Sequence, residues 1–490
     1  MALYLIAIGG TGAKCVEALV HLAGAGLCGE DFIWIVFVDQ DEANGNVTRA
    51  RTVIEVYRQC RALVQNTWMT TQIEVIGDVW APVSGANPTL SDFFNYHTYR
   101  QSNPKLGHLF EVLYGEAERE ISLEDGFRGR PAIGSAVMSH LQLAAQEPWR
   151  SLIEKIEKDP QAKVFLCGSV FGGTGASGLP TIARLIANQF EGLPIGGLLM
   201  LPYFEFPVER SLDEEVYAKP EEFLLTAEVA LRYYRTQAHN SSDNREITNY
   251  LGFSSIYLLG TPKLSPVSDR FKLGRAMQEN RQHFLELFGA LAIRHFQVHT
   301  PTNQVLLLKA NDPLEVTWND LPESSQVQEN LIGATRFAFA WTAKIVPELR
   351  EGLLDQENMA RSSPWVEHFY KVPKFFANPN LPELSNSGQQ QALSAITTWC
   401  KTYLQWLKAL HEDEVYKIRL FNTQAFGDFE NHANGQNGNF AALVDESSRI
   451  ERKRLDTVQR LVNRLDRRGI EEPNQGTVGL AKALYRLCQK

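Results

Sequence analysis

The sequence predicts an α/β fold built on a Rossmann-like, mostly parallel sheet, and its first 45 residues carry this prediction. Residues 3–8 and 32–38 are short, continuous apolar runs rich in branched residues, as expected of strands that are buried on both faces. A glycine turn and a helix-length segment, residues 13–25, separate them. Such a strand–helix–strand unit folds as a right-handed crossover within a parallel sheet.

The alternation of strands and helices continues to about residue 297. The further strands are expected at residues 163–167, 194–201 and 254–259, and helices at 135–145, 219–238 and 278–295. Two more strands, 304–309 and 336–341, are expected among polar loops beyond the last of these helices. The predicted organisation is a first domain at 1–275, a central helix at 276–297, a second α+β domain at 298–377, a linker at 378–391 and a helical C-terminal region at 392–490.

The composition is that of an ordinary globular protein. The chain has 490 residues, of which 44% are hydrophobic and 21% charged, with a formal net charge of −9 at pH 7. The acidic balance argues against sequence-independent binding to nucleic acid, which needs a basic surface. Six cysteines are scattered without a C-x-x-C pair, which favours reduced thiols over a zinc site or a disulfide framework. Because the chain shows no signal-peptide pattern and no apolar run of about twenty residues, we expect a cytoplasmic protein without a transmembrane segment.

Two glycine-rich turns stand where an expected strand passes into an expected helix. Glycine lets a phosphate group approach the backbone closely, and the helix behind it supplies unpaired N–H groups and a partial positive charge. Both turns are therefore placed to bind phosphate. The candidate residues are Gly9, Gly10, Thr11, Gly12 and Ala13 in the first turn, and Gly172, Gly173, Thr174, Gly175, Ala176 and Ser177 in the second.

The first turn alone leaves several interpretations open. It could be a tight turn of any α/β protein, or a degenerate dinucleotide fingerprint in which Cys15 occupies the place of the third small residue. A Walker loop is excluded, because Lys14 has no glycine before it and Cys15 stands where Ser or Thr would hold magnesium. The second turn, with its Gly-Gly-Thr-Gly run, is the more specific signal.

A third glycine-rich loop lies between the other two in the sequence and reads Gly126-Phe-Arg-Gly-Arg-Pro-Ala-Ile-Gly134. Arg128 and Arg130, on either side of Gly129, carry fixed cationic forks that suit phosphate oxygens. In isolation this would be a surface loop with solvated arginines. Its position between the two phosphate turns favours a functional interpretation.

Together the three loops resemble those of the tubulin/FtsZ superfamily, and most closely those of the divergent bacterial tubulin-like proteins. The second turn resembles the tubulin signature Gly-Gly-Gly-Thr-Gly-Ser-Gly, although Phe171 replaces the leading glycine and the last glycine comes one place late, at Gly178. The third loop resembles the FtsZ loop Gly-Ala-Gly-x-x-Pro-x-x-Gly. Residues 280–296 resemble the superfamily's central helix. The resemblance covers about residues 1–345.

The resemblance implies a nucleotide site for GTP or GDP, with Mg²⁺, and a fold of the tubulin type. Asp39, at the end of the second strand, would approach the nucleotide, or serve only as a strand-end cap. Residues 202–210 resemble the sugar-contacting loop, which makes Glu205 and Arg210 candidates. Asn280 or His283, at the start of the central helix, would meet the base, or both would have a structural role.

The resemblance also implies head-to-tail self-association into filaments, with hydrolysis at the contact between subunits. In the superfamily an acid that follows the central helix orients water on the neighbour's nucleotide, and Asp320 is the candidate here. Helix capping is the alternative role for Asp320. Nucleotide binding is thus better supported by the sequence than GTPase activity.

Two other functions remain open. The chain could be a non-polymerising nucleotide sensor that docks a protein partner through its C-terminal helices, where residues 447–468 form an expected basic, amphipathic helix. That helix could also lie on the core with a solvated basic face. The second possibility is a dinucleotide-dependent enzyme that uses the first strand–helix–strand unit, against which the second phosphate turn counts.

Overall fold

The computed structural model describes most of the chain. The described residues are 2–65, 67–83, 88–124, 126–127, 129–140, 142–205, 222–239, 252–266, 280–300, 305–307, 312, 314–372, 378–427, 440–444, 457–466 and 475–489. Arg128 and Arg210 lie outside them, as does most of the basic helix expected at residues 447–468.

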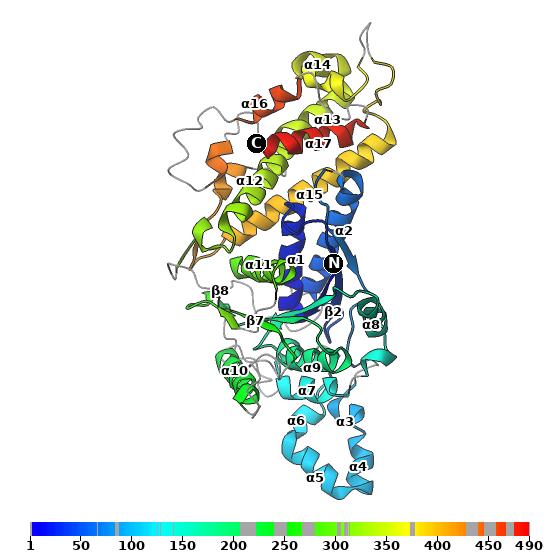
Figure 1. Ribbon diagram of the computed structural model, residues 1–490, viewed down its shortest axis with the longest axis vertical. Coiled ribbons are helices and arrows are strands. Elements are labelled where there is room, and N and C mark those ends of the chain that lie inside the picture. The colour runs from blue at the N-terminus through cyan, green and yellow to red at the C-terminus, as the bar shows by residue number, and fades with distance from the viewer. Residues whose placement is uncertain are drawn as a thin grey trace.

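A seven-stranded parallel sheet forms the centre of the protein (Figure 1). Its strand order is β3-β2-β1-β4-β5-β7-β9. The strands are β1 (Ala2–Ile8), β2 (Phe32–Val38), β3 (Gln72–Val75), β4 (Lys163–Ser169), β5 (Ile195–Met200), β7 (Ser255–Leu259) and β9 (Val305–Leu307). From β1 the chain builds outward through β2 and β3, and then returns to the other side of β1 with β4. The predicted α/β fold with a parallel sheet is confirmed.

Helices cover both faces of the sheet, because side chains of β1 alternate between two hydrophobic cores. Leu5 and Ala7 join the core beneath one set of helices, while Ile6 and Ile8 join the core beneath the other. The first set comprises α1 (Gly9–Gly24), α2 (Gly45–Val64) and the central helix α11 (Phe284–Val298). The second comprises α7 (Pro131–Met138), α8 (Trp149–Glu157), α9 (Gly173–Gln189) and α10 (Phe223–His239).

Two helices after residue 320 pack onto α2, and all the helices of this region lie at the opposite end of the molecule from α4 (Tyr96–Ser102) and α5 (Pro104–Leu113) (Figure 1). The helices of this region are α12 (Ser324–Ala340), α13 (Val346–Leu354), α14 (Gln356–Ser362), α15 (Ser387–His411), α16 (Val458–Asn463) and α17 (Thr477–Cys488). Their apolar side chains belong to the same core as α1. Trp406 of α15, for example, stacks on the ring of His21 with ring centres 4.6 Å apart.

One strand predicted after the central helix is wrong, and another belongs elsewhere than expected. Residues 336–341 are helical, as the end of α12 and the start of the next turn. This segment is almost wholly buried, so its alternating apolar pattern carried no information about secondary structure. The expected strand at 304–309 contains β9, which extends the main sheet. A short parallel pair, β10 (Glu315–Thr317) with β11 (Lys417–Arg419), joins this region to the segment after α15.

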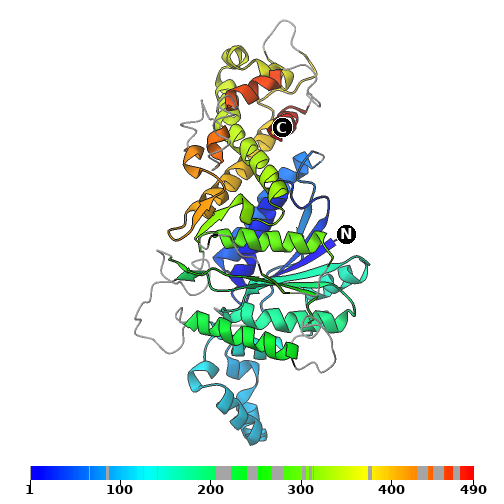
Figure 2. The same ribbon diagram turned by 60° about the vertical axis from the view of Figure 1, so that its left-hand side comes forward.

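A helical hairpin projects from the α7 and α9 side of the sheet and forms one end of the molecule (Figure 2). It consists of α3 (Leu90–Phe93), α4 (Tyr96–Ser102), α5 (Pro104–Leu113) and α6 (Glu116–Arg119). Elsewhere, a two-stranded pair, β6 (Phe204–Glu205) with β8 (Ser265–Pro266), follows the ends of β5 and β7. Of the helices that the structure describes, none has the length and apolar character needed to cross a membrane.

Candidate functional site

The two glycine-rich turns meet at the carboxyl edge of the sheet. The first leads from β1 into α1 and the second from β4 into α9, and in these neighbouring strands Ile8 lies opposite Gly168. A Cβ atom built on Gly9 would lie 3.8 Å from the Cβ atom of Thr174. Two helix N-termini therefore face the same space at the point where the strand order reverses, which is where open α/β sheets bind their ligands.

The N-terminus of α9 offers backbone donors to this space. The N–H of Ala176 donates to the carbonyl of Gly172 at 3.1 Å and begins the helical hydrogen-bond pattern. The N–H groups of Gly173, Thr174 and Gly175 precede it and have no partner within the helix. Such groups, at the positive end of a helix dipole, are suited to an anion.

Gly12 and Gly175 are required by packing. A Cβ atom on Gly12 would lie 2.6 Å from the carbonyl oxygen of Cys167, and one on Gly175 would lie 2.4 Å from that of Ser169. These are backbone atoms of β4, which cannot move aside without disturbing the sheet. Glycine at these positions lets α1 and α9 pack closely against the strand, whether or not a ligand binds.

Gly10 and Gly172 are less closely packed than Gly12 and Gly175. A Cβ atom on Gly10 would have the side-chain nitrogen of Asn46 as its nearest neighbour, at 3.0 Å. One on Gly172 would meet only the hydroxyl oxygen of Ser169, also at 3.0 Å. Both neighbours are ends of side chains, and neither glycine has a positive φ angle. Gly172 is also the N-cap of α9, a position where glycine is preferred to alanine. Close approach of a ligand to the backbone is a further physical reason for glycine at these two positions.

The third glycine loop lies directly against the second turn. A Cβ atom on Gly173 would lie 3.2 Å from the backbone nitrogen of Gly129 and 3.3 Å from that of Arg130. Gly129 has a φ angle of +73°, which glycine adopts without strain. Arg130 precedes α7 and forms an ion pair with Glu118 of the hairpin. The structure thus brings Gly129 and Arg130 to the phosphate turns, while Arg128 lies outside the described residues.

Asp39 follows the last residue of β2 and reaches the second turn. Its N–H donates to the carbonyl of Trp80 at 3.2 Å, and the hydroxyl of Thr174 is hydrogen-bonded to its carboxylate. Burial, and then the negative charge of Asp41, raise the pKa of Asp39 to about 7, because both disfavour the ionised form. The site therefore contains a carboxyl group that changes charge near neutral pH.

A third helix N-terminus, absent from the sequence-based expectations, lies at the same edge. Asn44 caps α2 by accepting a hydrogen bond from the N–H of Asn46 at 2.9 Å. The side-chain oxygen of Asn46 also accepts one from the N–H of Asn280 at 3.0 Å. Asn280 therefore lies close to the first glycine turn, held by its backbone. An Asn-x-Asn pair just after a buried strand was the available sequence signal for this cap.

A buried polar network lies beneath the first turn. Lys14 is only 2% exposed and forms an ion pair with Glu286 of α11. The hydroxyl of Tyr203 donates to Glu286 at 3.0 Å and accepts from Lys14 at 3.4 Å. The same hydroxyl is hydrogen-bonded to the side chain of Thr11. Lys14 thus points into the protein, and Thr11 is connected to the central helix through Tyr203.

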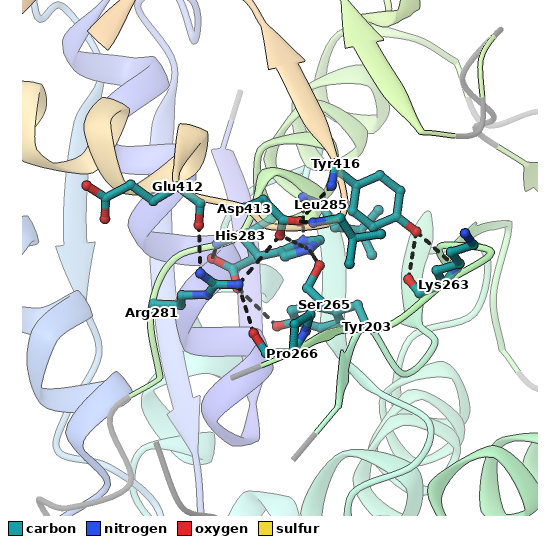
Figure 3. Close-up of polar contacts among 12 residues, drawn as sticks. Tyr203, Lys263, Ser265, Pro266, Arg281, His283, Leu285, Glu412, Asp413 and Tyr416 are labelled. Carbon is teal, nitrogen blue, oxygen red and sulfur yellow. Dashed lines mark hydrogen bonds and ion pairs between the residues drawn. The ribbon is translucent and has the colours of Figure 1, made fainter. Parts of the chain in front are cut away.

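Figure 3 shows how the N-terminus of α11 is held. His283 caps the helix, because its Nδ1 accepts a hydrogen bond from the N–H of Leu285 at 3.1 Å. Its Nε2 lies 3.1 Å from the hydroxyl of Ser265 and 3.5 Å from Asp413 in the turn after α15. Both ring nitrogens of His283 are therefore engaged within the protein, and the structure gives this residue a capping role.

Other predicted residues lie at or near this edge with different degrees of access. Ser177 is fully buried and donates a hydrogen bond to the carbonyl of Gly173 at 2.6 Å, so its hydroxyl is turned into α9. Ala13 is buried within α1. Glu205 is exposed on β6, and Arg210 lies outside the described residues.

Asp320 caps a turn between β10 and α12. Its carboxylate accepts hydrogen bonds from the N–H and the hydroxyl of Thr317, at 2.7 and 2.8 Å. Three residues later, Glu323 has a strained φ angle of +52°. Its carboxylate lies 2.6 Å from Arg294 and 3.4 Å from His299, at the C-terminal end of α11. Sequence reasoning missed Glu323, whose position at this helix end depends on the fold.

Comparison of the sequence with protein-family models finds no match, and comparison with curated proteins finds no significant match. Within the described part of the chain, no group of three or more His, Cys, Asp or Glu side chains is arranged to hold a metal ion. The geometry of the carboxyl edge is therefore the basis for a functional proposal.

Proposed function

We propose that this chain is a tubulin-like protein that binds GTP at the carboxyl edge of its sheet and assembles head to tail into nucleotide-dependent filaments. The observation that carries the proposal is the meeting of the N-termini of α1 and α9, each behind a glycine turn, where the strand order reverses. Two helix N-termini supply the converging N–H groups that a chain of phosphates requires.

Two further observations support a phosphate ligand. The nearest neighbours of a Cβ atom added at Gly10 or Gly172 would be the ends of side chains, at 3.0 Å, so the backbone at these positions is open to a ligand. The third glycine loop lies against the second turn, with the backbone nitrogens of Gly129 and Arg130 next to Gly173. The choice of GTP rests on the resemblance to tubulin and FtsZ. Bound Mg²⁺ would take its ligands chiefly from phosphate oxygens and water.

The course of α11 supports a head-to-tail contact. Its N-terminus lies at the carboxyl edge, beside Asn46. Its other end lies at the amino edge, where Lys163 donates hydrogen bonds to the carbonyls of Gln297 and His299, both at 2.8 Å. A residue that follows α11 would therefore meet the nucleotide of the next subunit in such a filament. In this proposal Asp320 orients the hydrolytic water.

The alternative, a sensor that docks a partner through its C-terminal helices, has less support. The described helices α15 and α17 bury their apolar faces against α1, α2 and α12. Trp399 and Tyr403 of α15, for instance, are 2% and 0% exposed. These faces already have partners within the chain, so they do not form a docking surface.

The test of binding compares GTP, ATP and NAD with the purified full-length protein by calorimetry and thermal unfolding, since a ligand that binds the folded state raises its unfolding temperature. We expect GTP to bind and NAD to have no effect. Gly10→Ala and Gly172→Ala should weaken the binding of GTP at least tenfold while the nucleotide-free proteins stay folded. Gly172→Ala should be less stable by up to about 1 kcal/mol, because it removes the glycine N-cap of α9. Gly388→Ala, on exposed α15 backbone, is the matched control and should bind normally.

The test of assembly is sedimentation with each nucleotide, followed by negative-stain electron microscopy of the pellet. Filaments with GTP alone are the expected result. A protein that binds GTP but never sediments would refute the filament proposal and leave the nucleotide site intact. Protection by NAD without protection by GTP would refute both.

A further inference from the structure

The helical hairpin α3–α6 leaves much of its apolar surface exposed. Leu106, Leu109 and Leu113 recur at i, i+3 and i+7 along α5, and they are 41%, 52% and 60% exposed. Val112, beside them, is 83% exposed, and Tyr99 of α4 is 43% exposed. Such a stripe is the face that a helix normally buries against a neighbour. These five residues are called the hairpin patch below.

The rest of the hairpin is well ordered by internal contacts, so the patch is not a consequence of loose packing. The ring of Tyr96 stacks on that of Phe110 with centres 5.3 Å apart. The carboxylate of Glu111 accepts a hydrogen bond from the hydroxyl of Tyr96 at 2.6 Å and forms an ion pair with Arg100 at 2.7 Å. A Cβ atom on Gly107 would lie 2.9 Å from the Cα atom of Arg100, so the two helices are in close contact.

A cavity of about 230 Å³ opens within the same surface, between α4, α5 and α7. Leu106, Leu109 and Leu113 line it, together with Tyr99. Val112 does not line it and stands out beside it. One continuous surface thus carries both an apolar hollow and the most exposed apolar knob of the hairpin.

We propose that the hairpin patch is a two-fold contact between two copies of this chain. In an isologous contact the same surface serves both partners, so it must be self-complementary. A hollow and a knob on the same helix meet this condition, because the knob of each copy can enter the hollow of the other. In such a pair, α4 and α5 of the two copies would form a four-helix bundle, which buries the face that a lone hairpin leaves in water.

The size of the patch fits a contact with a second copy of the chain. The exposed parts of its five side chains amount to roughly 500 Å², as large as the largest apolar patches found on monomeric proteins. Two copies would together bury on the order of 1,000 Å² of this surface, which reaches the lower bound for a specific interface. The helices that carry the patch, α4 and α5, form the end of the molecule beyond α7 and α9 (Figures 1 and 2), and in this proposal the contact leaves the carboxyl edge open. It is therefore independent of nucleotide.

Sedimentation velocity of the nucleotide-free, full-length protein tests the contact between 1 and 100 µM, concentrations that span roughly the affinity range of weak to moderate dimers. We expect a dimer that dissociates on dilution. Val112→Glu should raise the dissociation constant at least tenfold, with an unchanged unfolding temperature, because position 112 is already in water. Leu354→Glu, at a 92% exposed leucine of α13, is the matched control and should leave the dimer intact.

A Val112→Cys variant gives a second readout. The six native cysteines are all buried, so a short thiol cross-linker should react at position 112 and link two copies. A wild-type protein that stays monomeric at 100 µM would overturn the proposal, even if it binds vesicles or another protein through this face. A dimer that Val112→Glu and a second variant, Leu109→Glu, leave unchanged would overturn it as well.

Discussion

Replacement of Asp39 by asparagine should stabilise the nucleotide-free protein, and the gain should grow with pH. The pKa of this carboxyl is about 7 in the folded protein, against an ordinary value of 3.8 for aspartate. Between these two pH values the folded protein keeps a proton that the unfolded chain has lost. The cost of burying this carboxylate therefore begins above pH 3.8, increases until about pH 7, and is constant beyond it.

The size of the effect follows from the shift in pKa. The two pKa values correspond to a penalty of about 1.7 kcal/mol at pH 5 and about 4 kcal/mol at pH 8. Asparagine removes the charge and keeps an oxygen that can accept the hydrogen bond from Thr174. Asp39→Asn should therefore raise the free energy of unfolding by about these amounts.

Urea denaturation of the wild type and the variant at pH 5, 7 and 8 measures this difference. The difference between the two free energies of unfolding at each pH removes the contribution of titrating groups that behave alike in both proteins. Asp78→Asn is the control, because the side chain of Asp78 is 96% exposed and its replacement should change little at any pH. A difference for Asp39→Asn that is the same at all three pH values, or a variant that is less stable than the wild type, would refute the reasoning.

Binding of GTP without Mg²⁺ extends the same test to the proposed site. Phosphate next to an ionised Asp39 is opposed by like charge, so the affinity of the wild type should fall as the pH rises through 7. Asp39→Asn should bind with an affinity that changes much less over this range. Parallel pH profiles for the two proteins would place the phosphates away from Asp39.

Three further predictions concern other parts of the chain. Both ring nitrogens of buried His21 lack a hydrogen-bond partner, and burial lowers its pKa to about 3; His21→Phe should stabilise the protein by about 1–3 kcal/mol at pH 7. Because the unfolded histidine gains a proton below pH 6.5, the variant should also abolish a loss of about 2 kcal/mol between pH 7 and pH 5, measured by urea denaturation. Lys14→Met should lower the free energy of unfolding by about 3–5 kcal/mol, because it leaves Glu286 buried without its partner. The double variant with Glu286→Gln should recover part of that loss. Additive losses for the two substitutions would contradict this prediction. Asp320→Ala should abolish GTP turnover in a phosphate-release assay, preserve GTP binding and lower the free energy of unfolding by about 1 kcal/mol through loss of the cap. Glu323→Gln should keep GTP turnover in the same assay. The reverse pattern would transfer the catalytic role to Glu323.

The sheet was predictable because its strands are buried on both faces. Residues 3–8, 32–38 and 164–167 each form an unbroken apolar run, and glycine turns mark where two of them end. The same burial misled the prediction at residues 336–341, where α12 is surrounded by apolar partners and its alternating pattern has no polar side to reveal the helix. Hydrophobic periodicity identifies a helix or strand only when one of its faces is exposed to solvent.

The candidate site was predictable where the backbone needs glycine and not where side chains from distant segments meet. The phosphate turns stand out because glycine there allows close approach. Lys14 has no sequence signal for its ion pair with Glu286, which lies 272 positions away in the chain. Asn46 and Glu323 were likewise missed, because their partners Asn280 and Arg294 come close only through the packing of α11.

These distant contacts connect the first phosphate turn to the central helix. The side chain of Thr11 is bonded to Tyr203, whose hydroxyl donates to Glu286 in the first turn of α11. Glu286 also accepts a hydrogen bond from the N–H of His283 at 3.0 Å, and His283 in turn lies against Asp413 of the C-terminal region. The middle links of this chain, Tyr203, Glu286 and His283, are buried, where an unpaired polar group costs more than it would in water. A ligand that drew Thr11 toward a phosphate would therefore act on α11 and the C-terminal region together.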